Sequence, residues 1–224
     1  MARPRQSLLT RQRIVDAAVT LADAEGLEAV SVRRLATELG VRGPSLYNHF
    51  STKADILEAV ADTIVGQVDV SAFASHDWRD ALRLWARSYH AVVSAHPNIV
   101  PVIAQGPARR PASLAMADTV YGALVGAGWP ESRAVQIGAL IRYLVTGSAL
   151  GSFSHGFEGD PQTYQRYRHL HRAHLLVQYG QCVDERAFTL GLETLIAGLD
   201  AMLPALAAPR AGERNGAQSH DSIG

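Results

Sequence analysis

Residues 31–53 contain the pattern that most constrains the fold of this chain, two short helical segments separated by a tight glycine turn. Gly40 is expected to adopt the positive φ that ends the first segment. The predicted buried side consists of the apolar residues at helical spacing, namely Leu35, Ala36, Leu39, Val41, Leu46 and Phe50. This order predicts a helix-turn-helix.

The remaining side chains of the second segment are predicted to point outward. They are Arg42, Gly43, Pro44, Ser45, Tyr47, Asn48 and His49. A short exposed helix this rich in hydrogen-bonding groups suits insertion into the major groove of DNA. The alternative is an ordinary surface helix.

Segments on both sides of the helix-turn-helix match one family signature in a single register. They are residues 11–18, 25–27, 32–36, 39–41, 46–50 and 53–57. In these segments the chain resembles the tetracycline-repressor family of bacterial one-component regulators. The resemblance implies DNA contacts within the helix-turn-helix and at the start of the next helix. With the outward-facing Asn48 included, the predicted contact residues are Arg33, Arg42, Gly43, Pro44, Ser45, Tyr47, Asn48, His49 and Lys53.

The net charge of zero conceals an asymmetry between the two ends of the chain. Residues 1–53 hold eight basic and five acidic side chains, a net charge of +3, whereas the remainder carries −3. A basic end suits phosphate binding. Lys53 is the only lysine. It is expected to place a compact charge at the N-terminus of a helix capped by Ser51.

Composition favours a helical protein of the cytoplasm. The 224 residues are 47% hydrophobic, and the most apolar stretch, residues 135–153, is interrupted by Arg142 and three glycines, so no membrane span is expected. No export signal is visible at the N-terminus, and the single cysteine, Cys182, cannot form an intrachain disulfide.

No alternating strand pattern is present, and the predicted fold is all-α. Helices are expected over residues 11–25, 32–39, 44–50, 52–68, 78–95, 112–127, 130–153, 161–179 and 184–203. The predicted domains are a flexible arm (1–9), a helix-turn-helix DNA-binding domain (10–57, with a linker helix to about 68), an effector-binding and dimerisation domain (69–203) and a disordered tail (204–224). Arg3 and Arg5 are candidates for loose contacts with DNA.

The last predicted helix and the end of the helix over residues 130–153 are expected to meet a second copy of the chain. The proposed contacts are Phe188, Leu192, Leu195, Ile196, Leu199 and Met202, with Gly191, Gly198 and residues 147–152. The alternative is that both helices are internal core. A homodimer is favoured because a single half-site reads few bases, and because the family resemblance implies a four-helix interface.

Aromatic residues with a few polar groups suggest a binding site for a small organic effector in the C-terminal half. The candidates are Trp85, Tyr89, Tyr121, Trp129, Gln136, Tyr143 and Thr146, on helices that enclose an effector cavity in the resembled family. Ordinary packing is the alternative for each. Residues 102–106 lack the metal-coordinating histidine of tetracycline-binding relatives, so a magnesium-tetracycline effector is not expected.

No cofactor, metal site or enzymatic activity is predicted. His169 and His171 would lie about 200° apart on a helix, so they cannot converge with His174 on one ion. The sequence therefore predicts a homodimeric repressor that binds a palindromic operator in double-stranded DNA and is released by a small molecule. A ligand-independent or activating regulator, and an enzyme of the helical C-terminal domain, are the alternatives.

Overall fold

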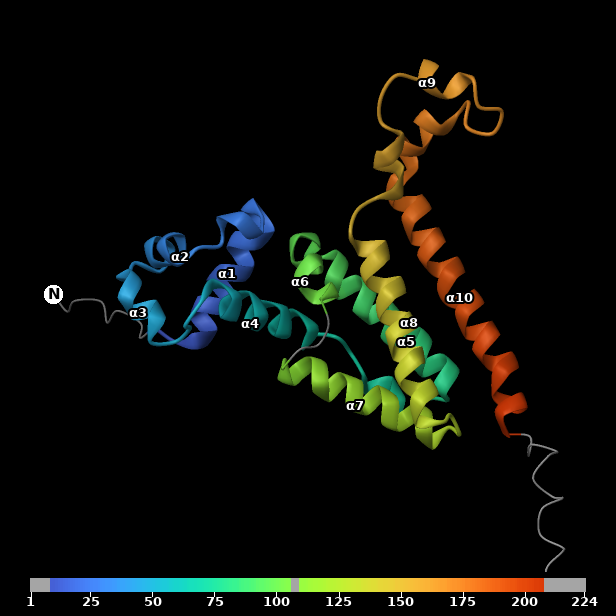
Figure 1. Cartoon of the computed structure of the whole chain (residues 1–224), viewed down its shortest axis with the longest axis horizontal. Coiled ribbons are helices and arrows are strands. Elements are labelled where there is room, and N and C mark those ends of the chain that lie inside the picture. The colour runs from blue at the N-terminus through green and yellow to red at the C-terminus, as the bar shows by residue number, and fades with distance from the viewer. Residues whose placement is uncertain (1–8, 106–108, 208–224) are drawn as a thin grey trace, which may run out of the picture.

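The structure, a computed structural model, describes residues 9–105 and 109–207, and every regular element in those ranges is helical (Figure 1). This confirms the all-α class. The α-helices are α1 (Arg11–Glu25), α2 (Val32–Leu39), α3 (Gly43–Tyr47), α4 (Lys53–Val65), α5 (Trp78–Ser94), α6 (Val100–Ala104), α7 (Pro111–Gly126), α8 (Glu131–Ala149), α9 (Gln162–Gln165) and α10 (Gly180–Ala207). Short 3-10 segments lie at Leu27–Ala29, Ser71–Ala74, Pro97–Ile99, Phe153–Phe157 and Ala173–Tyr179.

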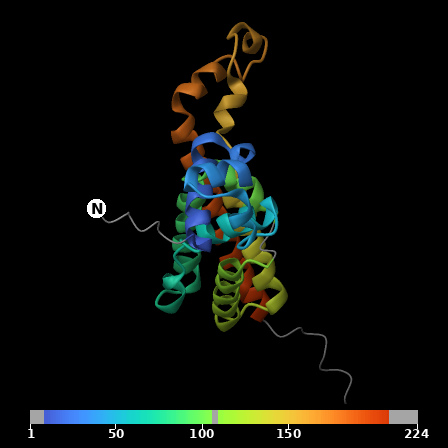
Figure 2. The same ribbon diagram turned by 90° about the vertical axis from the view of Figure 1, so that its left-hand side faces the viewer.

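Helix α4 joins the two ends of the molecule. Helices α1, α2 and α3 form one end, helices α5 to α8 and α10 form the larger end, and α4 packs against α1, α5, α6 and α7 (Figures 1 and 2). One hydrophobic core runs from Ile14 in α1 through Ile64 in α4 to Leu124 in α7, all three fully buried. A displacement of α4 therefore changes packing at both ends.

Side-chain caps set the ends of the first helices. Thr10 Oγ1 accepts a hydrogen bond from the Arg13 amide, and Ser31 Oγ accepts one from the Arg34 amide, so α1 and α2 begin where the sequence predicts. Gly40 ends α2 with φ 66°, the predicted left-handed conformation.

Helix α4 is capped by Thr52, and the prediction of Ser51 as its cap was wrong. Thr52 Oγ1 accepts from the Asp55 amide at 3.1 Å, while Asp55 Oδ2 accepts from the Thr52 amide at 2.9 Å. This reciprocal capping box satisfies two amides that Ser51 would leave unpaired.

Charged residues on one side of α5 hold α10 in place. Arg79 Nε donates to Asp200 Oδ1 at 2.7 Å, and Arg83 forms an ion pair with Glu193 at 3.0 Å. The opposite side of α5 buries Trp78, Leu82, Trp85 and Tyr89 in the core. Helix α5 therefore contacts α8 and α10 together.

The predicted helix over residues 161–179 was wrong. Only Gln162–Gln165 is α-helical there, and turns lead to a 3-10 segment at Ala173–Tyr179. Residues 165–172 are exposed throughout, so this stretch has no buried face to stabilise a helix. It forms the tip of a projection at the top of Figure 1.

Helix α10 is longer at both ends than predicted. It begins at Gly180, four residues before the predicted start at Asp184, whose carboxylate accepts a hydrogen bond from the Phe153 amide at 3.1 Å. It also continues past Pro204 to Ala207, four residues into the predicted tail. The rest of that tail and residues 1–8 of the arm, including Arg3 and Arg5, lie outside the described residues.

Four of the predicted dimer contacts on α10 face the chain's own core. Phe188, Leu192, Ile196 and Leu199 are buried against α5 and α8. A Cβ on Gly191 would lie 3.1 Å from Leu144 Cδ1, so this glycine brings α10 close to α8 of the same chain. For these residues the internal-core alternative is the right one.

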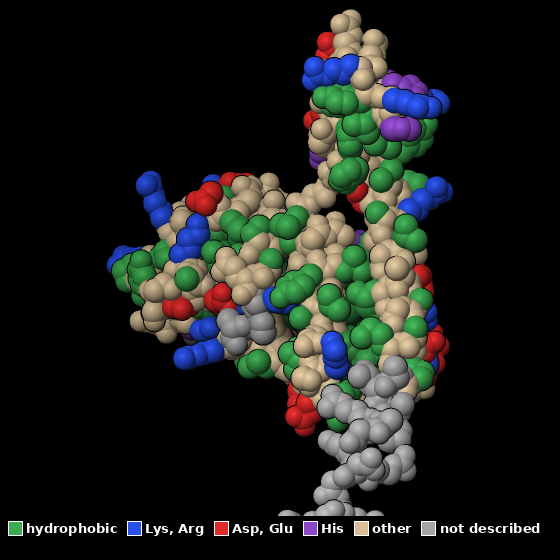
Figure 3. Space-filling view, turned by 45° about the vertical axis from the view of Figure 1, so that its right-hand side comes forward, with side chains coloured by type: hydrophobic (Ala, Val, Ile, Leu, Met, Phe, Trp, Pro, Cys, Tyr) green, Lys and Arg blue, Asp and Glu red, His purple; other side chains and the backbone are tan. Residues whose placement is uncertain are grey.

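The outward side of α10 remains apolar. By length and composition alone, the described stretch from Ala173 to Pro204 could cross a membrane; its most apolar window has a mean hydropathy of 1.3, and 22% of that window is buried. Leu190 is 70% exposed there, and Leu150 at the end of α8 is 60% exposed. Figure 3 shows hydrophobic side chains gathered on this side of the molecule.

Candidate DNA-binding surface and effector cavity

The two helices of the helix-turn-helix are fixed by buried side chains beneath them. Leu35 of α2 and Leu46 of α3 are at most 1% exposed, and Phe50 closes the same core. Helix α3 is shorter than predicted and ends at Tyr47. The Phe50 amide still donates to the Leu46 carbonyl at 3.0 Å, so the chain remains in a helical turn through His49.

The predicted DNA contacts lie on one end of the molecule with their side chains accessible. Arg33, Arg42, Pro44, Tyr47 and Asn48 are exposed, and Tyr47 keeps 58% of its surface in solvent. The partly exposed members of the set are Gly43, Ser45, His49 and Lys53. An exposed tyrosine beside arginines provides hydrogen-bond donors for phosphates and base edges.

Arg11 of α1 positions the end of α3. Its Nη1 donates to the His49 carbonyl at 2.8 Å, and its guanidinium stacks 3.9 Å from the centre of the Phe50 ring. These contacts fix the orientation of the short α3, which has only five residues. Arg11 belongs to one of the segments in which the chain resembles the family, but no local pattern in the sequence indicates that it positions α3.

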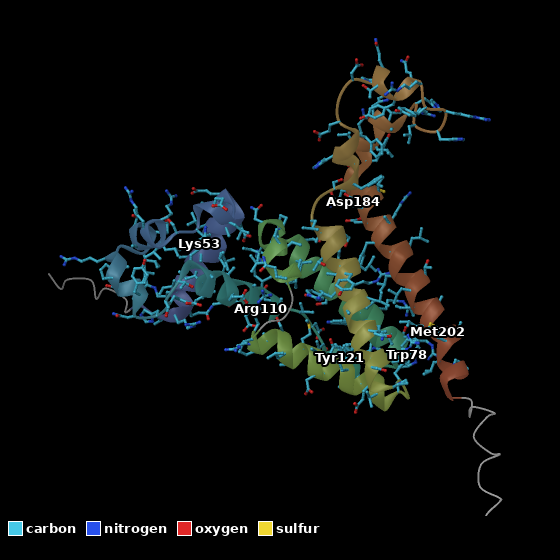
Figure 4. The ribbon with its side chains drawn as sticks, in the orientation of Figure 1. Lys53, Trp78, Arg110, Tyr121, Asp184 and Met202 are labelled. Carbon is cyan, nitrogen blue, oxygen red and sulfur yellow. The ribbon has the colours of Figure 1, made fainter. Side chains whose placement is uncertain are left out.

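Lys53 stands at the first residue of α4, as labelled in Figure 4. Its nearest carboxylate is Glu28 Oε2 at 4.0 Å, and the Glu28 side chain is fully exposed, so this ion pair is weak. The Lys53 ammonium is therefore available to a phosphate at the positive end of the helix.

A cavity of about 220 Å³ lies among α5, α6, α7 and α8. Three of the predicted effector contacts line it, Trp85, Tyr89 and Tyr121. The other lining residues are Ile103, Arg110, Ser113, Ala117, Val120, Val135, Gly138, Ala139 and Arg142. Burial raises the pKa of the Tyr89 phenol above its ordinary value, and positive charge from Arg142 and Arg110 acts in the opposite direction.

The other four predicted effector contacts lie outside this cavity. Trp129 packs edge-on against Trp78, with ring centres 5.4 Å apart. Gln136 and Tyr143 are exposed on α8, and the buried Thr146 hydroxyl donates to a carbonyl one turn earlier in its own helix. Trp129, between α7 and α8, and Thr146 are thus buried away from the cavity, whereas Gln136 and Tyr143 lie on the exposed side of α8.

Among the cavity residues that were not predicted from the sequence, two are charged, Arg110 and Arg142. Arg110 follows a loop and caps α7, and Arg142 appeared in the sequence only as an interruption of an apolar stretch. A charge within an apolar helix is a signal of a buried polar contact, and it would have pointed to Arg142. Nothing local in the sequence marks Arg110.

The histidine run at residues 169–174 forms no ligand cluster. Throughout residues 9–105 and 109–207, no group of three or more histidine, cysteine, aspartate or glutamate side chains is arranged to hold a metal ion. His171 Nδ1 lies 3.0 Å from the Arg168 carbonyl, within the exposed tip of the projection.

Comparison with protein families agrees with this architecture. Residues 14–60 match the family described as bacterial regulatory proteins, tetR family, and residues 74–203 match the tetracyclin repressor-like C-terminal domain. The second match alone covers more than half of the chain, and the two together include the helix-turn-helix and the cavity. The chain belongs to the TetR family of bacterial regulatory proteins.

Two curated relatives are similar over part of their length. An HTH-type transcriptional regulator of Saccharopolyspora erythraea is 35% identical over 141 residues, which are 63% of this chain and 60% of the relative. The HTH-type transcriptional repressor DrrR1 of Streptomyces coeruleorubidus is 33% identical over 142 residues, 63% of this chain and 53% of that protein. The matches thus span just over half of each relative.

Among solved structures, the chain is similar to ActR of Streptomyces coelicolor. The apo structure has a TM-score of 0.72 and 29% identity, covering 90% of this chain and 99% of ActR. The complex of ActR with actinorhodin has the same TM-score with 28% identity, covering 88% of this chain and 99% of ActR.

Proposed function

We propose that this chain is a transcriptional repressor of the cytoplasm that binds a palindromic operator as a homodimer and is released by a small organic effector. The observation that carries the proposal is the exposed α3 with Arg42 and Tyr47 on its surface, joined through α4 to a domain with an internal cavity. A relative named as a repressor and a structural neighbour solved with actinorhodin support the same interpretation.

The apolar outer side of α8 and α10 supports the dimer. Leu140, Leu150 and Leu190 are each at least 46% exposed, a large apolar area for a soluble monomer. Two copies that pack these sides together would form an interface of four helices and remove the leucines from water. The proposed dimer surface therefore consists of the exposed residues of α8 and α10, in place of the four buried residues named from the sequence.

Release by an effector requires that the cavity and the DNA-binding end be mechanically joined. Helix α4 packs against α6 and α7, which line the cavity, and begins at Lys53. A shift of α4 in each copy would change the separation of the two α3 helices. Both half-sites can be occupied only when this separation is about one turn of DNA, roughly 34–36 Å.

Selection from a random duplex library, with the full-length protein as bait, tests the DNA-binding part. The proposal predicts enrichment of an inverted repeat with half-site centres about 10 base pairs apart. Enrichment of a single unrepeated site, or of no sequence, would contradict it. A repeat that is bound but activates transcription in a reporter would favour an activator over a repressor.

A further inference from the structure

Arg110 connects the linker helix to the effector-binding domain. Its side chain is only 3% exposed, and its Nε and Nη2 donate to the two Glu58 carboxylate oxygens at 2.6 and 3.2 Å. Nη2 also donates to the Val102 carbonyl of α6 at 2.8 Å. Figure 4 labels Arg110 at the start of α7, where α4 passes it. One guanidinium thus links α4, α6 and α7.

The same guanidinium lies between two hollows of different character. On one side is the cavity with Trp85 and Tyr89, and on the other an open groove of about 910 Å³ between α1, α4 and the start of α7. Glu58 lines the groove, where 40% of its side chain is exposed. Water can therefore solvate the Glu58 carboxylate if it separates from Arg110, whereas the buried Arg110 requires another anion.

A second arginine lines the cavity without an anionic partner. Arg142 is partly exposed; its Nη1 makes one long hydrogen bond, 3.4 Å, to the Ala104 carbonyl, and its guanidinium lies 5.4 Å from the centre of the Tyr143 ring. Within residues 9–105 and 109–207, no carboxylate lies within ion-pair distance of it, and residues 106–108 are Gly-Pro-Ala. Arg110, Arg142 and Tyr89 all line this cavity.

The remaining walls favour an aromatic molecule. Trp85, Tyr89 and Tyr121 supply ring surfaces, and Trp85 Nε1 is buried with no acceptor among the described residues. Gly138 leaves room for the Tyr121 ring, since a Cβ at this position would overlap Tyr121 Cε1. A volume of about 220 Å³ suits one or two fused rings.

We infer that the effector is a small aromatic acid whose anionic group binds Arg142 and competes with Glu58 for Arg110. The inference rests on the proposed function, because it assigns a ligand class to that cavity and a trigger to that release. When the ligand anion replaces Glu58, α4 loses its ion pair with the start of α7. The remaining hydrogen bonds there are those that Asp62 Oδ1 accepts from the Ala112 amide at 2.9 Å and the Ser113 amide at 3.3 Å.

Matched pairs of acids and amides test the ligand class on the full-length protein. Benzoate, 1-naphthoate and 2-naphthoate are titrated by calorimetry and by tryptophan fluorescence alongside the corresponding primary amides. At least one carboxylate should bind about tenfold more tightly than its amide, because only the carboxylate forms an ion pair with arginine and offers two oxygens for a bidentate contact. If none of the three carboxylates binds, or if each amide binds as well as its acid, the inference is wrong.

Two arginine variants assign the preference to the cavity. Arg142→Met should reduce the preference for acid over amide several-fold while leaving the fold intact, as judged by circular dichroism, because only Arg110 then remains to bind the anion. The matched control is Arg133→Met, since Arg133 lies on the same helix but bonds to the exposed Gln136. Equal loss of the preference in both variants, or in neither, would overturn the role of Arg142.

Glu58→Gln tests the competition directly. Without the Glu58 charge, Arg110 should bind the ligand carboxylate several-fold more tightly. A purely structural role for Glu58 predicts unchanged or weaker ligand binding, and either result would refute the competition. These titrations contain no DNA. Failure of the proposed function would instead appear as the absence of an enriched inverted repeat.

Discussion

The helix-turn-helix and the cavity satisfy their polar groups in opposite ways. In the first, Thr10, Ser31 and Thr52 each accept a hydrogen bond from an amide three residues later, and Arg11 secures the end of α3. In the cavity, Trp85 Nε1 has no acceptor among the described residues, and the partly exposed Arg142 has no carboxylate partner among them, only a long hydrogen bond and the face of the Tyr143 ring. The first region is complete without a ligand. The second leaves polar groups that a bound molecule would satisfy.

Loss of the dimer should produce the largest effect on DNA binding. Leu190→Arg would place a charge in the proposed interface, and an uncompensated buried charge costs about 3–5 kcal/mol. Operator affinity should fall by about 100-fold or more, with a halved mass in light scattering. The matched control is Leu114→Arg, because Leu114 is a 49% exposed leucine on α7, away from that interface. A monomer that still bound the palindrome tightly would refute the dimer.

Substitution within the helix-turn-helix should have the next largest effect. Arg42→Ala should cost roughly 1–3 kcal/mol per half-site and relax the preference at one base position, because Arg42 is placed to reach base edges. Fluorescence anisotropy with operators changed at single positions measures this decrease in affinity.

Lys53→Ala provides the contrast for Arg42→Ala. It should weaken binding to all sequences alike and reduce the slope of log affinity against log salt by about one for each phosphate that the lysine no longer neutralises. If both variants relaxed the sequence preference equally, the division between base-reading and phosphate-binding residues would be incorrect.

A change confined to the cavity should leave DNA binding unaltered and weaken effector binding. Gly138→Ala would force the Tyr121 ring to move, because the new Cβ would overlap it, and the affinity for the aromatic acid should fall by about tenfold. Gly122→Ala is the control, since no atom lies within 4 Å of its Cβ position. Calorimetry measures the ligand affinity of both variants. Equal affinities would contradict the assignment of the effector to this cavity.

The smallest expected effect is on stability at acidic pH. His90 of α5 stacks on Phe188 of α10 with ring centres 4.0 Å apart, and burial lowers the pKa of His90 below 6.5, while Glu185 acts in the opposite direction. As the pH falls, the unfolded chain therefore takes up this proton before the folded chain does. The contribution of the neutral His90 to the free energy of unfolding is complete above about pH 6.5 and is lost as the pH falls below that value. Melting temperatures between pH 5 and 8 should show a shallower decline for His90→Phe than for the unsubstituted chain.

The sequence predicted the helix-turn-helix more accurately than the cavity, and the reason is physical. The ends of α1 and α2 depend on caps within three residues of each helix, so local sequence determines them. The cavity brings together residues from four helices, and the Arg110 pair with Glu58 joins positions 52 residues apart. The sequence named Trp85 and Tyr89 as candidate effector contacts, but it could not show which of the candidates would adjoin an empty volume.

The stretch before α10 was mispredicted for a related reason. The composition of residues 161–179 is compatible with a helix, but this region projects from the body and has little core to pack against. Helices of this length gain most of their stability from tertiary packing. The same limitation explains why buried residues of α10 were predicted as dimer contacts. The inner side of this helix can be distinguished from its outer side only from its packing against α5 and α8.

Reciprocal calorimetry tests the coupling between the two regions most directly. The tightest-binding aromatic acid is titrated into the dimer with and without the selected inverted repeat, and the repeat is titrated with and without the acid. The account predicts that operator weakens acid binding by the same factor by which the acid weakens operator binding. Equal acid affinities in the presence and absence of operator would contradict it.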